Sequence, residues 1–156
     1  MFVPVSVEYN RANLNYIATF LRKNKIPFFI FFGTLLGITR DNDIIKNDDD
    51  VDIYINIKDR DKLFSVINET EFEIDYNSPQ NQTKFFLQIY KKIRENVFSY
   101  VELYFYEEID NYIVDRWNFR GVGNKKSASI YIPKNIIFPI KDITFNGDIV
   151  CVPHDE

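Results

Sequence analysis

The chain has 156 residues, of which 46% are hydrophobic and 27% charged, a balance typical of one folded domain rather than of a disordered chain. Its formal net charge is −4, so it lacks the basic surface of nucleic-acid-binding proteins, and we expect no nucleic-acid partner. A single cysteine, Cys151, and a single histidine, His154, exclude an internal disulfide, a zinc site and a Ser-His-Asp triad. The longest apolar run, residues 26–32, is far too short to span a membrane. We therefore expect a cytoplasmic protein.

The first part of the chain predicts a helix, a strand and a second helix. Apolar residues recur at helical spacing within residues 8–24, which indicates an amphipathic helix. The aromatic run 28–32 is too short for a buried helix and predicts a central strand. Residues 34–40 predict a short helix with Thr34 as its N-cap, and the polar residues 41–43 end it.

Strict alternation marks the next segment, residues 50–58. Val51 and Ile53 begin a series of apolar side chains on one face, while Asp50 and Asp52 begin a polar series on the other. This pattern predicts a strand with one buried and one exposed face.

The remaining elements complete the predicted fold. Residues 59–68 have helical spacing, and residues 84–91 and 98–106 are rich in aromatic and β-branched residues, as strands are. The polar residues 116–129 predict a mobile loop. We expect one α+β domain over residues 1–156, with a mixed β-sheet flanked by helices.

Aspartates at positions 48, 49, 50 and 52 form the first candidate site. If the strand extends back to Asp48, then Asp48, Asp50 and Asp52 project to one face at spacings of roughly 6–7 Å. At an effective dielectric constant near 20, two charges so far apart repel by ~2.5 kcal/mol, which divalent cations between them would relieve. Oxygen-only ligands favour Mg²⁺ or Mn²⁺. The alternative is a solvated acidic turn before the strand.

Glu102 is the second candidate. It is the only carboxylate within the apolar and aromatic residues 100–106, where burying it without a partner would be costly. One interpretation places it beside Asp50 and Asp52 on a neighbouring strand. The other places it on an edge strand, facing water.

A phosphate-binding turn is the third feature. Gly33 and Thr34 at a helix N-terminus offer backbone N–H groups to a phosphate opposite the metals. Arg40 either contacts a phosphate or neutralises the C-terminus of this short helix. Tyrosines at strand spacing, such as Tyr54 and Tyr104, either line a base or sugar pocket or pack in the core, and we favour packing.

These motifs resemble those of the LicD and fukutin-related phosphotransferases, a branch of the nucleotidyltransferase superfamily. The resemblance rests on Gly-Thr-Leu-Leu-Gly-x-x-Arg at residues 33–40, on the aspartate run at residues 48–52, and on Glu102. Three shorter segments of this chain also resemble family signals, although each pattern is common by itself. They are Phe-Pro at residues 138–139, Phe-x-Gly at residues 145–147 and Val-Pro at residues 152–153. The resemblance implies a nucleotidyltransferase-like fold.

The implied activity is metal-dependent transfer of a phospho-alcohol, such as phosphocholine or a phospho-alditol, from a CDP-activated donor to a sugar hydroxyl of a glycan. The resemblance implies that Mg²⁺ or Mn²⁺ is held by Asp48, Asp50, Asp52 and Glu102, the last three being catalytic. It also implies that Gly33, Thr34 and Arg40 hold the donor phosphate.

The chain also departs from the family pattern. Lys46-Asn47 stands where Pro-Trp is usual, and no tyrosine-glycine segment follows the Val-Pro signal, so we expect a domain shortened at its C-terminus. Two alternatives remain open: a nucleotidyltransferase acting on a small molecule or protein, and a non-catalytic module that binds metal or nucleotide.

Overall fold

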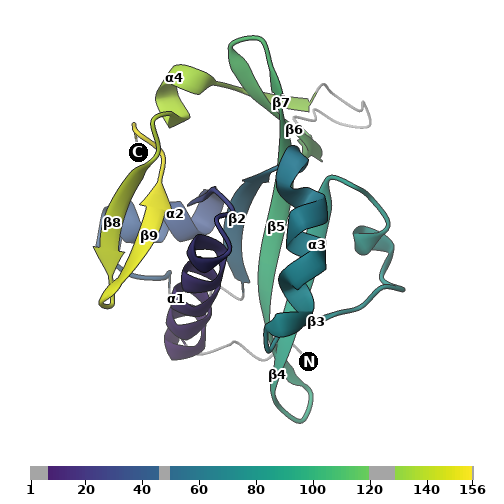
Figure 1. The fold of residues 1–156 in the computed structure, drawn as a ribbon. Helices are drawn as coiled ribbons and strands as arrows, with labels where there is room; N and C mark the ends of the chain where they lie inside the picture. Colours follow the sequence, from purple (N-terminus) through teal and green to yellow (C-terminus); the bar gives the residue numbers. More distant parts are fainter. Residues whose placement is uncertain (1–6, 46–49, 120–128, 156) are drawn as a thin grey trace.

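The computed structural model describes residues 7–45, 50–119 and 129–155. The fold is α+β, as expected (Figure 1). Its helices and strands, in chain order, are α1 (Val7–Lys23), β1 (Phe28–Ile30), α2 (Phe32–Asp41), β2 (Asp50–Asn56), α3 (Arg60–Val66), β3 (Glu73–Ile74), β4 (Phe86–Arg94), β5 (Val97–Ile109), β6 (Tyr112–Phe119), β7 (Ser129–Pro133), α4 (Lys134–Ile137), β8 (Lys141–Phe145) and β9 (Asp148–Val152).

Strands β2 and β5 lie at the centre of a mixed sheet with the order β1-β2-β5-β4-β3. β6 pairs with the distal end of β5, and β7 pairs with β6, while β8 and β9 form a separate hairpin. β2 and β5 are parallel, and α3, β3 and β4 lie in the long connection that a parallel pair requires. In this register Asp52 lies opposite Glu102.

Side-chain alternation along the strands divides the core into two. The larger cluster is mainly aliphatic and joins strand residues such as Ile53 and Leu103 to Leu14 of α1 and Leu63 of α3. In Figure 1 these two helices lie in front of the sheet. The second cluster is mainly aromatic and contains Phe29, Tyr54, Phe86, Tyr104 and Tyr106. Because Asp50, Asp52 and Glu102 share the parity of these tyrosines, their side chains belong to the aromatic face.

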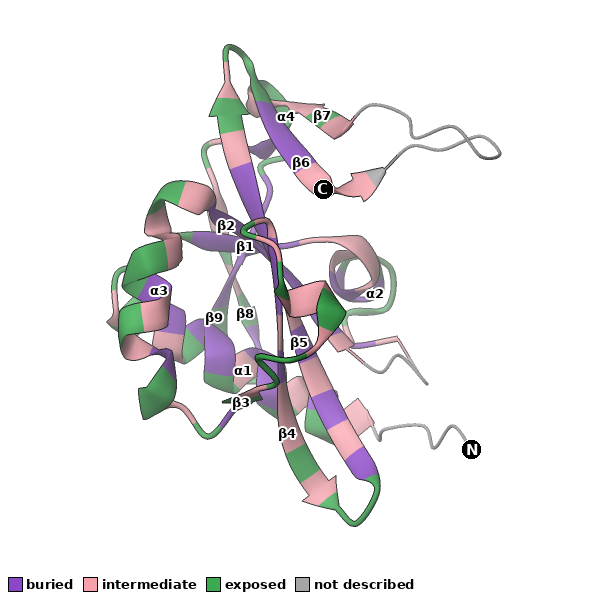
Figure 2. Ribbon diagram, turned by 90° about the vertical axis from the view of Figure 1, so that its right-hand side faces the viewer, coloured by how far each residue is buried: buried purple, intermediate pink, exposed green. Residues whose placement is uncertain are grey.

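The structure corrects the prediction that β2 is half-buried. Every residue from Val51 to Asn56 is buried, and Figure 2 shows this strand enclosed within the molecule. The aliphatic cluster covers one face, and the aromatic cluster covers the other. Alternation of polar and apolar residues therefore reflected a polar site inside the protein, not a solvent-exposed face.

Three boundaries also differ from expectation. The strand predicted over residues 28–32 ends at Ile30, because α2 begins at Phe32, whose φ of 49° is unusual for a bulky residue. Thr34 therefore lies inside α2 and is not its N-cap. Residues 116–119 belong to β6 rather than to a loop, and residues 120–128 lie outside the described part of the chain.

Gly37 lets the chain fold back closely over α2. Asn42 caps this helix in a left-handed conformation, with φ of 55°, and its N–H and that of Asp43 return to carbonyl groups of the last turn. A Cβ atom on Gly37 would lie only 2.5 Å from the carbonyl oxygen of Asp43 and 2.9 Å from the side chain of Ile45. Only glycine therefore fits between α2 and the segment that leads to β2.

We predict that Gly37→Ala lowers the free energy of unfolding by ~1–3 kcal/mol, because the added methyl group overlaps backbone that cannot move without displacing the α2–β2 connection. Urea unfolding measures this difference. Leu36→Ala is the matched control on the same helix: its side chain is 51% exposed, and we expect a change within ~0.5 kcal/mol. Equal stability of Gly37→Ala and the wild type would contradict the close packing.

Candidate active site

Three carboxylates meet where β2 and β5 run side by side. Asp50 and Asp52 from β2 and Glu102 from β5 each offer one oxygen atom, and these atoms all lie within 4.8 Å of one another. An ion with metal–oxygen distances of ~2.0–2.6 Å reaches oxygens roughly 4–5 Å apart, so the three side chains fit a single divalent cation. The structure thus brings together the residues expected to cluster, whereas Asp48 lies outside the described residues.

Thr34 connects the start of α2 to Asp52. The backbone N–H of Asp52 donates to the Thr34 hydroxyl at 2.9 Å, and the backbone N–H of Phe31 donates to the Asp52 carbonyl at 3.2 Å. Thr34 is only 1% exposed. The first turn of α2, which contains Gly33, is thereby fixed beside the carboxylates. The N–H groups of a helix's first turn have no intrahelical partner, so this end of α2 favours an anion.

Tyr104 is a site residue that the sequence analysis assigned to packing. Its hydroxyl donates to Glu102 at 2.7 Å and lies 3.1 Å from Asp52 Oδ1. Burial raises the pKa of this phenol, and the neighbouring Asp52 and Glu102 raise it further, so it remains a donor. Its ring packs against Phe32 and Phe86. The available signal was its position two residues after Glu102 on one strand face, because a buried tyrosine hydroxyl requires a partner.

Gln88 completes the surroundings of Glu102. The β4 strand places Gln88 opposite Glu102, and its side-chain amide donates to Glu102 Oε1 at 3.2 Å. Asn81 in turn accepts from the Gln88 backbone N–H at 2.8 Å. Asp52, Glu102 and Gln88 therefore form a row across three adjacent strands, which excludes the alternative that Glu102 lies on an edge strand.

Asp115 is a second functional candidate that the sequence analysis missed. It is 2% exposed and accepts the hydroxyl of Tyr54, the backbone N–H groups of Trp117 (2.9 Å) and Asn118 (3.0 Å), and the Asn118 side-chain amide (2.7 Å). Four donors offset the cost of burying this carboxylate. Burial, and then Asp115, raise the pKa of Tyr54. Only the fold reveals this cluster, because two of its members, Trp117 and Asn118, lie in the segment 116–129 that was predicted to be a loop.

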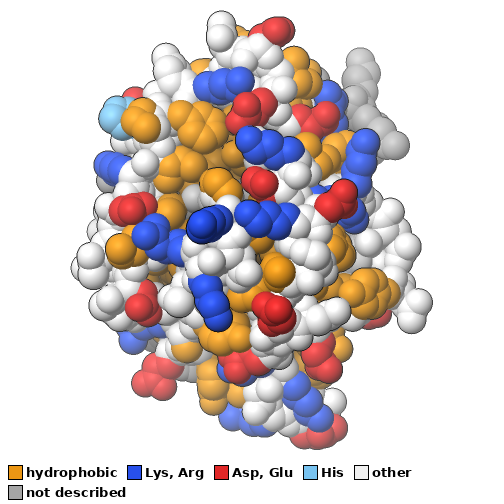
Figure 3. All heavy atoms as spheres, in the orientation of Figure 1, with side chains coloured by type: hydrophobic (Ala, Val, Ile, Leu, Met, Phe, Trp, Pro, Cys, Tyr) orange, Lys and Arg blue, Asp and Glu red, His pale blue; other side chains and the backbone are white. Residues whose placement is uncertain are grey.

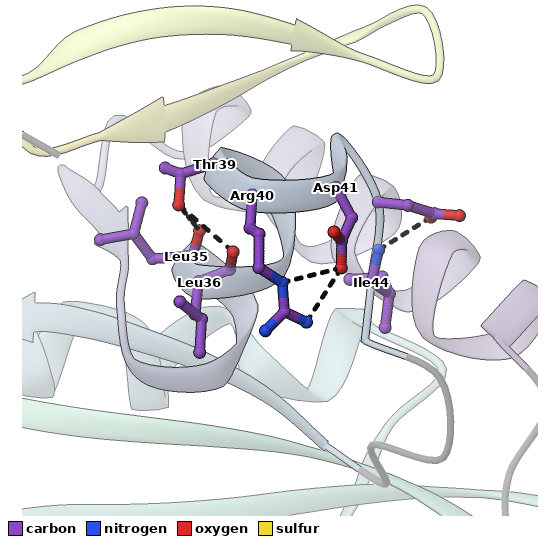
Figure 4. A network of polar contacts seen from close by, with 7 residues as sticks. Leu35, Leu36, Thr39, Arg40, Asp41 and Ile44 are labelled. Atoms are coloured by element: carbon purple, nitrogen blue, oxygen red, sulfur yellow. Dashed lines mark hydrogen bonds and ion pairs between the residues drawn. The ribbon is translucent and has the colours of Figure 1, made fainter.

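Arg40 lies at the opposite end of α2, roughly 10 Å along the helix from Gly33. Its guanidinium donates to Asp41 Oδ2 from Nε at 3.1 Å and from a terminal nitrogen at 2.9 Å (Figure 4). This hydrogen-bonded pairing with Asp41 raises the pKa of Arg40. In the described structure Arg40 thus contacts the C-terminal turn, whereas Thr34, at the other end of α2, bonds to the backbone of Asp52.

A cavity of about 410 Å³ lies apart from this site, between the end of α1, β1 and the β8–β9 hairpin. Arg22, Lys25 and Cys151 contribute to its lining. Figure 3 shows Lys and Arg side chains gathered on this helix-covered face. Burial raises the pKa of the Cys151 thiol to about 11, which makes it a poor nucleophile at neutral pH. The carboxylates on the aromatic face therefore remain the candidate site.

The mixed sheet and its carboxylates on adjacent parallel strands define a nucleotidyltransferase-like domain. Two solved structures share this fold. One is the lincomycin-bound lincosamide antibiotic adenylyltransferase LnuA, with a TM-score of 0.55 and 10% sequence identity over 97% of this chain and 82% of that chain. The other is an antigenic nucleotidyltransferase-like protein from Paracoccidioides brasiliensis, with a TM-score of 0.55 and 15% identity. That match covers 97% of this chain but only 63% of the fungal protein.

The chain belongs to the LicD/FKTN/FKRP family, whose nucleotidyltransferase-domain model matches residues 25–155. The family membership expected from the Gly-Thr and aspartate motifs is confirmed. A search of curated protein sequences finds no match to the chain. Within the described residues, no helix is both long enough and apolar enough to cross a membrane.

We predict that Tyr104→Phe lowers the free energy of unfolding by ~1–3 kcal/mol in metal-free buffer, because it removes a hydrogen bond to a carboxylate while keeping the ring. Chemical denaturation with chelator present measures the effect. Tyr90→Phe on β4 is the control, since the Tyr90 hydroxyl makes no hydrogen bond within the described structure and its ring contact with Phe98 is kept. If both variants lose the same stability, the Tyr104 hydroxyl has no special role.

Proposed function

We propose that this protein is a divalent-metal-dependent phosphotransferase. It moves a phospho-alcohol, of the phosphocholine or phospho-alditol type, from a CDP-activated donor to a sugar hydroxyl of a glycan or glycoconjugate. The observation that carries the proposal is the convergence of Asp50, Asp52 and Glu102 within 4.8 Å, beside the first turn of α2. Family membership supports a transferase, and the donor and acceptor follow from the family resemblance.

The three candidate metal ligands match Mg²⁺ or Mn²⁺, because each of these side chains would bind the metal through an oxygen atom. Asp50, Asp52 and Glu102 would hold the cation, with Asp48 as a proposed further ligand. A divalent cation in this position supplies Lewis-acid stabilisation of the charge that develops on the donor phosphates.

The protein's own groups would divide the remaining work. Backbone N–H groups at Gly33 and Thr34 orient a donor phosphate, and the Thr34 hydroxyl keeps α2 in register with Asp52. A carboxylate of the cluster accepts the proton of the attacking sugar hydroxyl. The new bond joins the sugar oxygen to the phosphorus that carries the alcohol, and the bond from this phosphorus to the leaving CMP breaks. Tyr104 holds Glu102 in position through its hydrogen bond.

Nucleotidyl transfer is the second candidate, because the same carboxylates would serve it and LnuA, a protein of similar fold, is an adenylyltransferase. The two reactions differ in their products. Phospho-alcohol transfer from a CDP ester releases CMP, whereas nucleotidyl transfer from a nucleoside triphosphate releases pyrophosphate. Mass spectrometry of products from labelled CDP esters and labelled nucleoside triphosphates distinguishes the two.

We predict that Asp52→Asn lowers turnover of the preferred donor by more than ~100-fold, because it removes a metal ligand from the reacting centre. In metal-free buffer the variant should be as stable as the wild type or slightly more stable, since one of three repelling charges is lost. Calorimetric titration should show weaker Mg²⁺ or Mn²⁺ binding.

Asp61→Asn is the matched control, because the Asp61 side chain is fully exposed on α3, away from the site. It should keep both turnover and metal affinity. Unfolding of Asp52→Asn without metal would make Asp52 a structural residue, and unchanged metal affinity would contradict the assignment. A wild-type protein that binds metal and nucleotide but yields no product from any donor would instead be a binding module.

A further inference from the structure

A stack of aromatic rings leads from the carboxylates towards the surface. The ring centroid of Phe86 lies 5.3 Å from that of Tyr104, and the Tyr104 hydroxyl contacts Asp52 and Glu102. The Trp117 indole stacks on the Phe86 ring, with the ring centroids 4.4 Å apart and the two planes only 9° from parallel. Phe86 is buried, whereas Trp117 is half-buried, so the indole forms the outer layer of the stack.

The backbone that carries Trp117 is held by hydrogen bonds to a buried carboxylate, Asp115. The Trp117 backbone N–H and both N–H groups of Asn118 donate to Asp115, which also accepts the hydroxyl of Tyr54 from β2. A buried carboxylate thus ties the end of β6 to the strand that carries Asp50 and Asp52. The hydrogen bonds fix the backbone at Trp117, and the stacking on Phe86 aligns the indole with the aromatic face that carries the carboxylates.

We propose that Trp117 is the platform on which the nucleobase of the donor stacks, while the donor phosphates reach Asp50, Asp52 and Glu102. The inference rests on the proposed function and deepens it. The two ring contacts put Trp117 no more than about 10 Å from the Tyr104 ring, a separation that one nucleotide bridges between its base and its phosphates. Every nucleobase has a flat π-face that stacks on aromatic side chains.

Asn118 indicates which bases fit. Its amide nitrogen donates to Asp115, which turns the amide oxygen away from that carboxylate. In the inferred complex this oxygen, one residue along the chain from Trp117, accepts from an exocyclic amino group of the stacked base. Cytosine and adenine carry such an amino group, whereas uracil has a carbonyl oxygen in its place.

Intrinsic fluorescence tests the platform directly, because Trp117 is the only tryptophan in the chain. The wild-type protein is titrated with CMP in saturating Mg²⁺, and ribose 5-phosphate is the probe without a base. CMP should quench the emission, and UMP should bind more weakly than CMP. Ribose 5-phosphate should bind through its phosphate, as seen by calorimetry, without quenching.

Substitutions separate stacking from phosphate binding. Trp117→Ala should weaken CMP binding by roughly 5- to 150-fold, the range for losing one base–aromatic stack, and leave the affinities for ribose 5-phosphate and Mg²⁺ unchanged. Trp117→Phe keeps a stacking ring and should retain most of the affinity. Tyr112→Ala is the control, because Tyr112 is an exposed aromatic at the far end of β6, paired with Tyr131. It should change nothing.

The outcomes distinguish this inference from the proposed function. If CMP binds in the presence of Mg²⁺ without quenching, and Trp117→Ala keeps the wild-type affinity, the platform is wrong and the proposed function stands. If neither CMP nor a CDP ester binds to the wild type with Mg²⁺, both fail. If Trp117→Ala does not fold, the contrast between CMP and ribose 5-phosphate in the wild-type fluorescence decides alone.

Discussion

The parallel pairing of β2 with β5 holds Asp52 opposite Glu102, and the site depends on this one contact between like charges. Two unit charges 4.8 Å apart repel by about 3.5 kcal/mol at an effective dielectric constant near 20. The backbone ladder prevents the strands from separating, and hydrogen bonds from Tyr104 and Gln88 partly neutralise Glu102. Replacing one carboxylate with a neutral residue would remove this repulsion. A fold that keeps the three carboxylates together is therefore best explained by a divalent cation that binds between them.

The two faces of the sheet have different tasks. The aliphatic face packs against α1 and α3 and supplies most of the buried apolar core. The aromatic face combines burial with polar ends: Tyr54 and Tyr104 pack by their rings and donate their hydroxyls to Asp115 and Asp52 or Glu102. Tyrosine suits this layer because one side chain fills the core and still provides a hydrogen-bond donor near an anion. The wall of the candidate site is therefore part of the core, and its geometry is as rigid as the packing.

Local patterns predicted much of this arrangement. The alternation of β2 placed Asp50 and Asp52 on one face, and a lone acid in an apolar strand made Glu102 a candidate neighbour, with a water-facing edge strand as the alternative. What the sequence did not reveal depends on contacts between distant segments. The hydroxyl of Thr34 bonds to Asp52 instead of capping its own helix, and the partners of Tyr104 and Asp115 follow from strand register. Burial of both faces of β2 required the second cluster, which the chain forms from residues as distant as Phe29 and Ile137.

The central claim is that Asp50, Asp52 and Glu102 together form one divalent-cation site. Anomalous X-ray diffraction from crystals grown with Mn²⁺ tests it most directly, because the metal is located without assumptions about activity. The account predicts an anomalous peak within ~2.0–2.6 Å of an oxygen from each of the three carboxylates, allowing for a second peak beside it. Mn²⁺ found elsewhere, or absent from the three carboxylates at saturating concentration, would contradict it.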